Sequence, residues 1–345
     1  MANIIKWTGG KERELTTIIN ELPPKIIDYY EPFVGGGSVF LKMSNVASHL
    51  YINDRSKNLY ALYKAIKLRD NNVFKNMCII NDTWKKIYND TISYQVELLS
   101  FYNTEDFNII KSWALYPIFG HKDLYEKYFI SCIKRKKSKT KELESTMKDK
   151  DAVFKNIQTS IFGAFYTYLR ELYNKNILLD EENTAIFFFL RMYAFNGMFR
   201  YNKNGEFNVP YSGMSYNKKT MDKNIDFYSC QELQEIFSRT TLCNEDFETF
   251  LNLHIPKEND FLFLDPPYDT TFSTYDNNIF NEDDHRRLFN VINNLRCNWM
   301  LVIKTSPLIE DLYKNFNIIR YDKLYQVNIK NRNDRDVEHL LIKNY

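Results

Sequence analysis

The sequence predicts an α/β fold, in which a doubly wound, mostly parallel sheet is interrupted by an inserted, mainly helical region. Two short apolar runs of strand length, at residues 261–264 and 299–303, have a segment with helical spacing between them. This alternation is typical of a sheet covered by helices on both faces. Between residues 82 and 190 strands are hard to find and helical spacing is common. We therefore expect residues 1–73 and 228–345 to build the sheet and residues 74–227 to form the insertion.

The first predicted strand, at residues 25–30, leads into the sequence Glu-Pro-Phe-Val-Gly-Gly-Gly-Ser at residues 31–38. Glycine lets the backbone approach a ligand closely, and we expect Ser38 to cap the helix that follows. The next short strand ends at Asp54, at roughly the distance from the glycines where nucleoside-binding sheets place a carboxylate for ribose hydroxyls. The glycines match neither the dinucleotide pattern nor the P-loop pattern. They favour a nucleoside without a pyrophosphate, and S-adenosylmethionine fits that description.

The most informative motif is Asp-Pro-Pro-Tyr at residues 265–268, directly after the apolar run 261–264. Ligands collect at such strand ends in open α/β sheets. The prolines remove two backbone donors, so Asp265 and a carbonyl of the Pro266 segment can accept both hydrogens of an exocyclic amine. Tyr268 can stack on the base that carries the amine. By itself the motif also fits a rigid turn, but the glycines and Asp54 in the same chain favour a site for a base.

A capped amphipathic helix and a buried strand are predicted after this motif. Asn281 and a run of acids come first, and the strand is expected at residues 299–303. The apolar residues that recur at helical spacing and should pack on the sheet are Leu288, Val291, Ile292 and Leu295.

Four blocks of the sequence, in this order along the chain, resemble the Dam-like DNA adenine-N6 methyltransferases, the alpha group with the DPPY motif. The blocks are residues 6–11, 31–38, 193–210 and 265–268, and residues 337–345 look like the closing strand of the family. The resemblance covers about two thirds of the chain and is poor between about residues 74 and 160. It implies a Rossmann-like, S-adenosylmethionine-dependent methyltransferase sheet with an inserted helical target-recognition subdomain.

The resemblance implies methyl transfer from S-adenosylmethionine to the N6 amine of an adenine flipped out of double-stranded DNA, with a GATC-containing site the first to test. It implies that Asp265, Pro266 and Tyr268 act on the adenine. The residues implied to bind the cofactor are Trp7, Lys11, Phe33, Gly35, Gly37, Asp54, Asp246 and Asp265. The residues implied to contact DNA are Phe195, Asn196, Arg200 and Pro210, and the Gly-rich loop itself adds Tyr201 and Asn202.

Composition adds few constraints on function. The net charge of +2 does not indicate a nucleic-acid binder by itself, so any phosphate-binding surface must be local. Residues 134–141 carry six positive charges, and they fit either a solvated loop or an arm that contacts phosphates. The five cysteines and five histidines show no metal-ligand spacing, so we expect no catalytic metal and no disulfide framework.

No apolar signal-peptide segment precedes Lys6, and the longest strongly apolar stretch, residues 185–190, is too short to span a bilayer. We expect a soluble, intracellular protein, in a bacterium or in a virus- or phage-infected cell, with no membrane partner. The sequence leaves open whether a cognate restriction endonuclease accompanies it. Two other functions also stay open, namely a methyltransferase for RNA or protein glutamine, and a catalytically decayed DNA-binding module.

Overall fold

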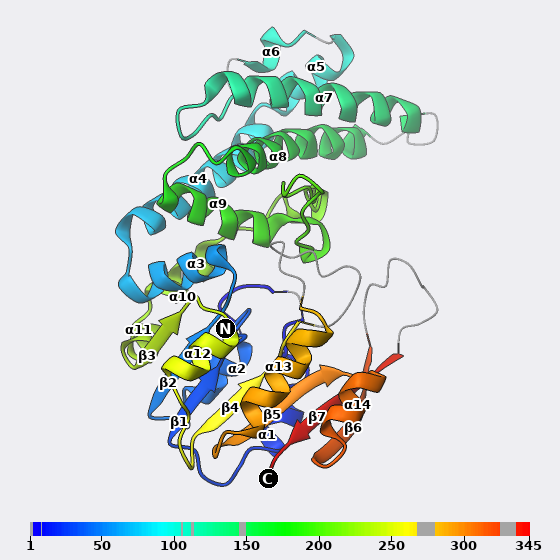
Figure 1. Ribbon diagram of the computed structural model, residues 1–345. Helices are drawn as coiled ribbons and strands as arrows, with labels where there is room; N and C mark the ends of the chain where they lie inside the picture. The colour runs from blue at the N-terminus through cyan, green and yellow to red at the C-terminus, as the bar shows by residue number, and fades with distance from the viewer. Residues whose placement is uncertain are drawn as a thin grey trace. The chain divides into compact units, whose positions relative to one another are not determined.

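A computed structural model describes the chain except for residues 1–2, 8, 105, 112–113, 145–149, 268–279 and 325–335. The chain divides into two compact units (Figure 1), which we name the sheet unit, residues 1–67 with 231–345, and the helical unit, residues 68–230. The sequence-based division lies after residue 73 and before residue 228, and its assignment of the insertion to target recognition stays a prediction. No helix in the described part of the chain is long and apolar enough to cross a membrane.

The sheet unit contains a seven-stranded sheet in the order β3-β2-β1-β4-β5-β7-β6. Strands β1 to β5 run parallel, and β7 runs antiparallel to both of its neighbours. The strands are β1 (Asp28–Glu31), β2 (His49–Asn53), β3 (Thr240–Cys243), β4 (Phe261–Leu264), β5 (Asn298–Lys304), β6 (Asn317–Leu324) and β7 (Asp336–Lys343). The predicted α/β fold with a mostly parallel sheet is confirmed.

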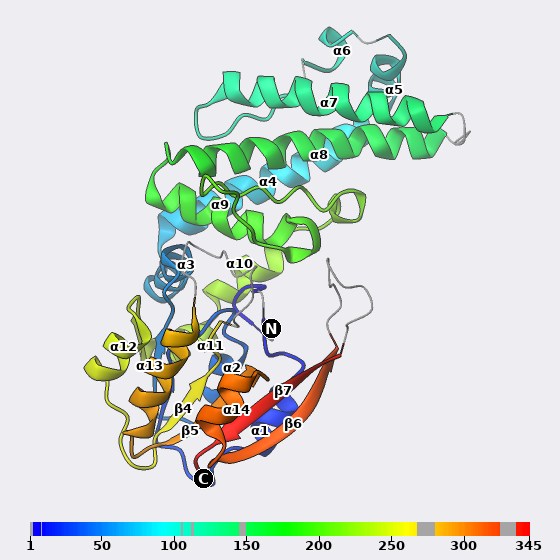
Figure 2. The same ribbon diagram turned by 45° about the vertical axis from the view of Figure 1, so that its right-hand side comes forward.

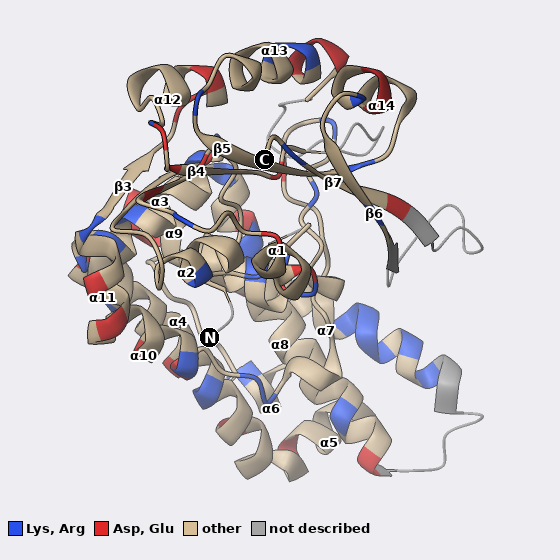
Figure 3. Ribbon diagram, turned by 90° about the horizontal axis from the view of Figure 1, so that it is seen from below, with Lys and Arg blue, Asp and Glu red and all other residues tan. Residues whose placement is uncertain are grey.

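Helices cover both faces of this sheet. Figure 3 shows α12, α13 and α14 on one face and α1 and α2 on the other. The helices are α1 (Leu15–Asn20), α2 (Ser38–Met43), α3 (Lys57–Leu68), α11 (Gln231–Ser238), α12 (Phe247–Leu253), α13 (Glu282–Asn293) and α14 (Pro307–Tyr313). As predicted, Asn281 caps α13, because its side chain accepts the Asp284 N–H at 3.1 Å. The buried Leu288 and Ile292 of this helix join a core with Leu262.

The register of the parallel strands brings three strand ends together. Tyr30 of β1 pairs with Tyr51 of β2 on one side and with Leu262 of β4 on the other. The carboxyl ends of β1, β2 and β4 therefore lie at the same edge of the sheet. In the sheet, β2 lies on one side of β1 and β4 lies on the other side. The topological switch point therefore lies between β1 and β4. This is where open α/β sheets bind ligands.

The helical unit is built almost wholly from helices, as the spacing of its apolar residues predicts. Its core surrounds the buried Trp84, whose ring lies 4.5 Å from that of Phe162 and 4.6 Å from that of Tyr193, centroid to centroid. The helices are α4 (Asn71–Ser93), α5 (Gln95–Thr104), α6 (Asn108–Lys111), α7 (Lys122–Glu144), α8 (Lys150–Lys175), α9 (Asp180–Tyr193) and α10 (Asp222–Ser229), with 3-10 turns η1 (Phe195–Gly197) and η2 (Met214–Tyr216).

The basic run at residues 134–141 is not a loop. It lies within α7, which packs along α8 in an antiparallel pair (Figure 2). Lysine and arginine are good helix formers, and the buried Ile133, directly before the run, and Phe129, one turn before Ile133, give α7 an apolar face. The expectation of a solvated loop was wrong because it weighed the charges alone.

Candidate functional site

The glycine turn after β1 is closely covered by the N-terminal segment. The Ile4 N–H donates to the Gly36 carbonyl at 2.8 Å. A Cβ atom added to Gly35, whose φ is +49°, would lie 2.9 Å from Cδ1 of Trp7, and one added to Gly36 would lie 2.6 Å from the Ile5 carbonyl oxygen. Any side chain at these two positions would displace the segment. The structure thus places Trp7 directly on the turn, and its role in cofactor binding stays a prediction.

Gly37 rather than Ser38 caps α2. Gly37 adopts a left-handed conformation with φ of +76°, and Ser38 is already the first helical residue and makes no capping bond. The prediction that Ser38 is the N-cap was wrong, because the left-handed residue ends the turn one position earlier. A Cβ at Gly37 would also come within 2.4 Å of the Tyr63 hydroxyl, so only glycine fits here.

Asp54, directly after β2, is held against this turn. Its Oδ2 accepts the Gly35 N–H at 3.0 Å and its Oδ1 accepts the Ser56 N–H at 2.9 Å. Its backbone carbonyl accepts the Asn244 side-chain amide at 2.7 Å. These bonds fix the direction of the carboxylate, which stays half-buried. Two residues predicted to bind the same ligand, Gly35 and Asp54, are therefore in direct contact.

Asn53 was missed by the sequence analysis. Only 1% of this side chain is exposed. Its amide donates to the carbonyls of Pro32 and Glu245, both at 3.0 Å, and its Oδ1 accepts the Glu245 N–H at 2.8 Å. Asn53 therefore ties together the segments that leave β1, β2 and β3. The sequence did carry a signal for Asn53, because it is a polar residue at a strand end, directly before Asp54.

Asp265, at the end of β4, forms an ion pair with Lys11. The Nζ atom lies 2.6 Å from Oδ2, and the two side chains are only 3% and 19% exposed. Burial by itself would lower the pKa of Lys11, but the negative charges of Asp265 and Glu14 raise that pKa above its ordinary value. Lys11 thus stays protonated beside Asp265. Pro266 is buried, and Tyr268 lies outside the described residues.

Glu31, the last residue of β1, is a buried acid that the sequence analysis did not select. It is 2% exposed, and its Oε2 accepts the Tyr29 hydroxyl at 2.9 Å. Burial raises the pKa of Glu31 well above its ordinary range, and the negative charges of Asp265 and Asp54 raise it further, against the opposing effect of the Tyr29 bond. Its place as the first residue of the block 31–38 was the signal.

Replacing Glu31 with glutamine should flatten the dependence of stability on pH. Because the folded pKa of Glu31 lies above its unfolded value, its contribution is fully present below about pH 4.3 and is lost as the pH rises through the folded pKa. Glutamine still accepts the Tyr29 hydroxyl and cannot ionise. Melting temperatures of both proteins between pH 4.5 and pH 8 test this, with the exposed Glu232→Gln as the control. Parallel curves for wild type and Glu31→Gln would contradict it.

Phe33 belongs to a cluster of three rings beside the same strand ends. Its centroid lies 5.7 Å from that of Phe247 and 5.8 Å from that of Phe280, the latter edge-on at 84°. Phe247 and Phe280 are buried, whereas Phe33 is partly exposed. Such a ring can pack against a planar ligand.

Asp246 has a structural task in addition to its predicted role. Its side chain caps α12 by accepting the Glu248 N–H at 3.1 Å. Arg287 donates to both of its carboxylate oxygens at 2.9 Å, a bidentate contact. These contacts explain the local geometry without a ligand, and the cofactor-binding role of Asp246 stays a prediction.

The helical unit brings several of the predicted DNA contacts together. The Phe195 N–H donates to the Pro210 carbonyl at 2.9 Å. Phe195, Asn196, Arg200 and Pro210 are all exposed, and 43% of the Phe195 surface is accessible to solvent. The Phe195 ring is therefore accessible to a partner.

Tyr201 and Asn202 stabilise the hairpin in which they lie. The Asn202 Oδ1 accepts the N–H groups of Asn204 and Glu206 at 2.9 and 3.0 Å. The Tyr201 hydroxyl lies 3.2 Å from that of Tyr173. Both side chains are half-buried, so they shape the loop, and their predicted contacts with DNA remain untested.

Metal-ligating side chains do not gather anywhere in the described part of the chain. No group of three or more His, Cys, Asp or Glu residues there could hold a metal ion.

Comparison with known proteins gives consistent relatives. The profile of the D12 class N6 adenine-specific DNA methyltransferases matches residues 7–112 and 123–327. The chain is 25% identical over 348 positions to the Type II methyltransferase M.CviBI of Paramecium bursaria Chlorella virus NC1A, with 100% of both chains covered. It is 26% identical over 360 positions to the Type II methyltransferase M.MjaIII of Methanocaldococcus jannaschii, covering 99% of this chain and 98% of the relative. It is 31% identical over 156 positions to the retron Ec67 DNA adenine methylase of Escherichia coli, covering 44% of this chain and 52% of the relative.

Proposed function

The chain belongs to the D12 class N6 adenine-specific DNA methyltransferases, and on that premise we propose that it methylates an adenine flipped out of double-stranded DNA, with S-adenosylmethionine as the methyl donor. The observation that carries this proposal is the convergence of Asp265, the glycine turn and Asp54 at the switch point of the sheet. Family membership argues against RNA or protein glutamine as the substrate.

The charges at the strand ends fit a cationic nucleoside. S-adenosylmethionine supplies a methyl group that is already activated on a positively charged sulfur. Around Glu31, the two carboxylates of Asp54 and Asp265 outnumber the single cation of Lys11. A bound cation would offset this excess of negative charge. Asp54 would hold the ribose hydroxyls, since its carboxylate is oriented by the glycine turn.

Asp265 would act by accepting a hydrogen bond from the adenine amine. Its carboxylate and a carbonyl of the Pro266 segment would take both N–H groups, which favours a nitrogen whose lone pair points toward the methyl group. Lys11 would hold the carboxylate in place through their ion pair. The new C–N bond would form as the C–S bond of the donor breaks, the donor would leave as a neutral thioether, and the methylated amine would then release one proton to solvent. Alignment and fixed charges would lower the barrier to the transfer itself. Stacking of the adenine on Tyr268 is part of the proposal.

The exposed loop of the helical unit supports the part of the proposal that concerns base flipping. An adenine must leave the duplex before its amine can be bound in this way, at a cost of a few kcal/mol. Phe195 is exposed and is held beside Pro210 by a backbone bond. It is therefore available to fill the space that the base leaves.

One experiment tests the proposal as a whole. The protein is expressed in a host without adenine methylation, and its plasmid is sequenced by a method that detects modified bases. We expect N6-methyladenine within one short sequence, with GATC-containing sites tested first. If a cognate restriction endonuclease exists, the same plasmid should resist its cleavage at that sequence. Unmodified plasmid, with no transfer of labelled methyl to DNA by the purified protein, would refute the proposal. Binding of labelled cofactor without transfer would indicate a decayed module.

Arg200 is expected to read a guanine. Its exposed guanidinium donates through Nε to the Asn208 side chain at 3.2 Å, which orients it at the base of the hairpin. Arg200→Ala should cost about 1–3 kcal/mol at the recognised site and relax the preference at one position. Methylation of a library of sites measures this, with Lys203→Ala as the matched loss of an exposed charge in the same hairpin. Equal slowing at every site would instead make Arg200 a phosphate contact.

A further inference from the structure

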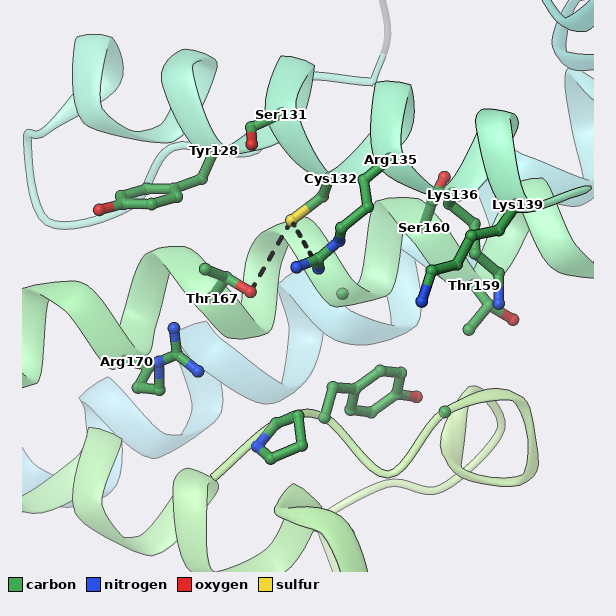
Figure 4. A pocket seen from close by; sticks show the side chains of 14 residues that line it. Tyr128, Ser131, Cys132, Arg135, Lys136, Lys139, Thr159, Ser160, Thr167 and Arg170 are labelled. Carbon is green, nitrogen blue, oxygen red and sulfur yellow. Dashed lines mark hydrogen bonds between the residues drawn. The ribbon is translucent and has the colours of Figure 1, made fainter. Parts of the chain in front are cut away.

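A basic groove lies within the helical unit, between α7, α8 and residues 210–213. It is a cavity of about 500 Å³ lined by Arg135, Lys136 and Lys139 of α7 and by Arg170 of α8. Figure 4 shows Arg135 and Lys139 extending from α7 toward α8, and Figure 3 shows the run of basic residues along α7. The proposed chemistry of the sheet unit uses none of these residues.

The positive charges in this groove are poorly compensated. Among the residues that the structure describes, no carboxylate forms an ion pair with Arg135, Lys136 or Lys139. Burial lowers the pKa of Lys136, and the neighbouring charges of Lys139 and Arg135 lower it further. Arg170 pairs with Glu171 at 3.1 Å. The protein as a whole carries a net charge of only +2, so this concentration of cations is local and favours a polyanion.

The floor of the groove is open at Gly163, in the interior of α8. Glycine is the least favourable residue in a helix interior apart from proline. No atom lies within 4 Å of a Cβ added to Gly163, so packing does not require a glycine there. Its effect is to leave the floor without a side chain, where the backbone of a ligand can approach closely.

The same helix, α8, also holds the exposed loop of the helical unit that carries Phe195 and Pro210. The Tyr166 hydroxyl donates to the Val209 carbonyl at 3.0 Å. The Asn174 side chain bonds both backbone groups of Phe207, at 3.0 and 2.8 Å. Pro210 lines the groove and accepts the backbone bond from Phe195. The groove and the exposed Phe195 are therefore adjacent, and their separation is fixed by α8.

We propose that this groove, lined by Arg135, Lys136, Lys139 and Arg170 over Gly163, binds the sugar-phosphate backbone of the DNA beside the bases that the loop contacts. The proposal rests on the proposed function, because it assigns the groove to the same substrate. Arg135 and Lys139 are separated by about 6 Å along α7, close to the axial rise of two nucleotides of one strand. The groove thus accommodates two or three successive phosphates.

The test compares two triple variants of the full-length protein. Arg135→Gln, Lys136→Gln and Lys139→Gln remove the groove charges. Lys122→Gln, Lys127→Gln and Lys134→Gln remove three exposed charges from the same helix outside the groove. The affinity for a labelled duplex of about three helical turns is measured by fluorescence anisotropy between about 50 and 200 mM salt.

We expect the groove variant to bind at least roughly tenfold more weakly, with a salt slope reduced by about two to three. The control should change its slope by less than one. Equal changes in both variants, or none in either, would overturn the proposal.

A second variant keeps every charge and fills the groove. A Cβ atom at Gly163 meets nothing within 4 Å outside the adjacent turns of its own helix, so Gly163→Leu should weaken duplex binding several-fold with an unchanged circular dichroism spectrum, whereas Gly163→Ala should bind like the wild type. This keeps the proposal testable if the triple variant fails to fold. Wild-type affinity for both Gly163 variants would overturn it.

Two further readouts separate the other possibilities. Duplex binding is measured without cofactor, and transfer of labelled methyl by the wild type tests the proposed function by itself. If the wild type methylates DNA while the groove variants bind and methylate equally well, only the groove proposal fails. If the wild type does not methylate DNA while the groove variants lose binding, only the proposed function fails. Calorimetric titration with inorganic phosphate tests whether the groove binds a small anion instead of DNA. Saturable phosphate binding, together with unchanged duplex affinity of the groove variants, would also overturn the proposal.

Discussion

Replacing Asp265 with asparagine is expected to slow methyl transfer by about 10²–10³-fold, the range for loss of one preorganised polar group in an active site. Asparagine keeps the size of the side chain and an oxygen that can accept from Lys11, but it loses the negative charge that would hold the adenine amine. Affinity for duplex DNA should persist, because phosphate and base contacts lie elsewhere. Single-turnover transfer of labelled methyl and fluorescence anisotropy measure the two effects.

The ion pair with Lys11 complicates the simpler substitution by alanine. Removing one member of a buried pair costs about 3–5 kcal/mol of stability, so Asp265→Ala can lose activity through unfolding alone. The double variant Lys11→Met with Asp265→Asn removes the unpaired charge and is the matched control for stability. If Asp265 only pairs with Lys11, this double variant should regain activity together with its melting temperature. Because Lys11 is itself predicted to bind the cofactor, recovery of stability and of labelled-cofactor binding without recovery of activity would support a direct role of Asp265 at the amine.

Replacing Asp54 with alanine is expected to raise KM for S-adenosylmethionine by about 10- to 100-fold, because hydrogen bonds to a charged group contribute about 1.5–3 kcal/mol each. KM for DNA should change far less. Steady-state kinetics with each substrate varied in turn separate the two constants.

Asp54 also holds the Gly35 and Ser56 N–H groups, so its loss disturbs the turn as well. Asp28→Ala is a matched control, since that acid caps the opposite ends of the same strands by accepting the His49 N–H at 3.1 Å. The control should lower the melting temperature without a selective effect on either KM. An equal rise of both constants in Asp54→Ala would make this acid structural.

Much of the sheet and its edge could be read from local patterns. The run at residues 261–264 is apolar at every position, and it became β4 with all four side chains buried. Asn281 and the helical spacing after it became a capped helix, α13. These elements are encoded by propensity and periodicity over a few neighbouring residues, so a single sequence suffices.

The contacts that join distant segments were beyond local reading. Lys11 and Asp265 are 254 positions apart, and nothing in either neighbourhood shows that they pair. Glu31 and Asn53 were overlooked because their importance comes from burial and from partners on other strands. The helix through the basic run was hidden because its apolar partners on α8 lie outside the run itself.

The sequence by itself determined the fold class, the order of the motifs and the residue types available for chemistry, because these depend on spacing along the chain. Only the tertiary structure decided which of those residues share a site. The register of β1 against β2 and β4 sets that choice, because parallel pairing brings the ends of strands that are remote in sequence to one edge of the sheet. The groove over Gly163 likewise exists only because α7 packs against α8, which brings four basic side chains to one cavity.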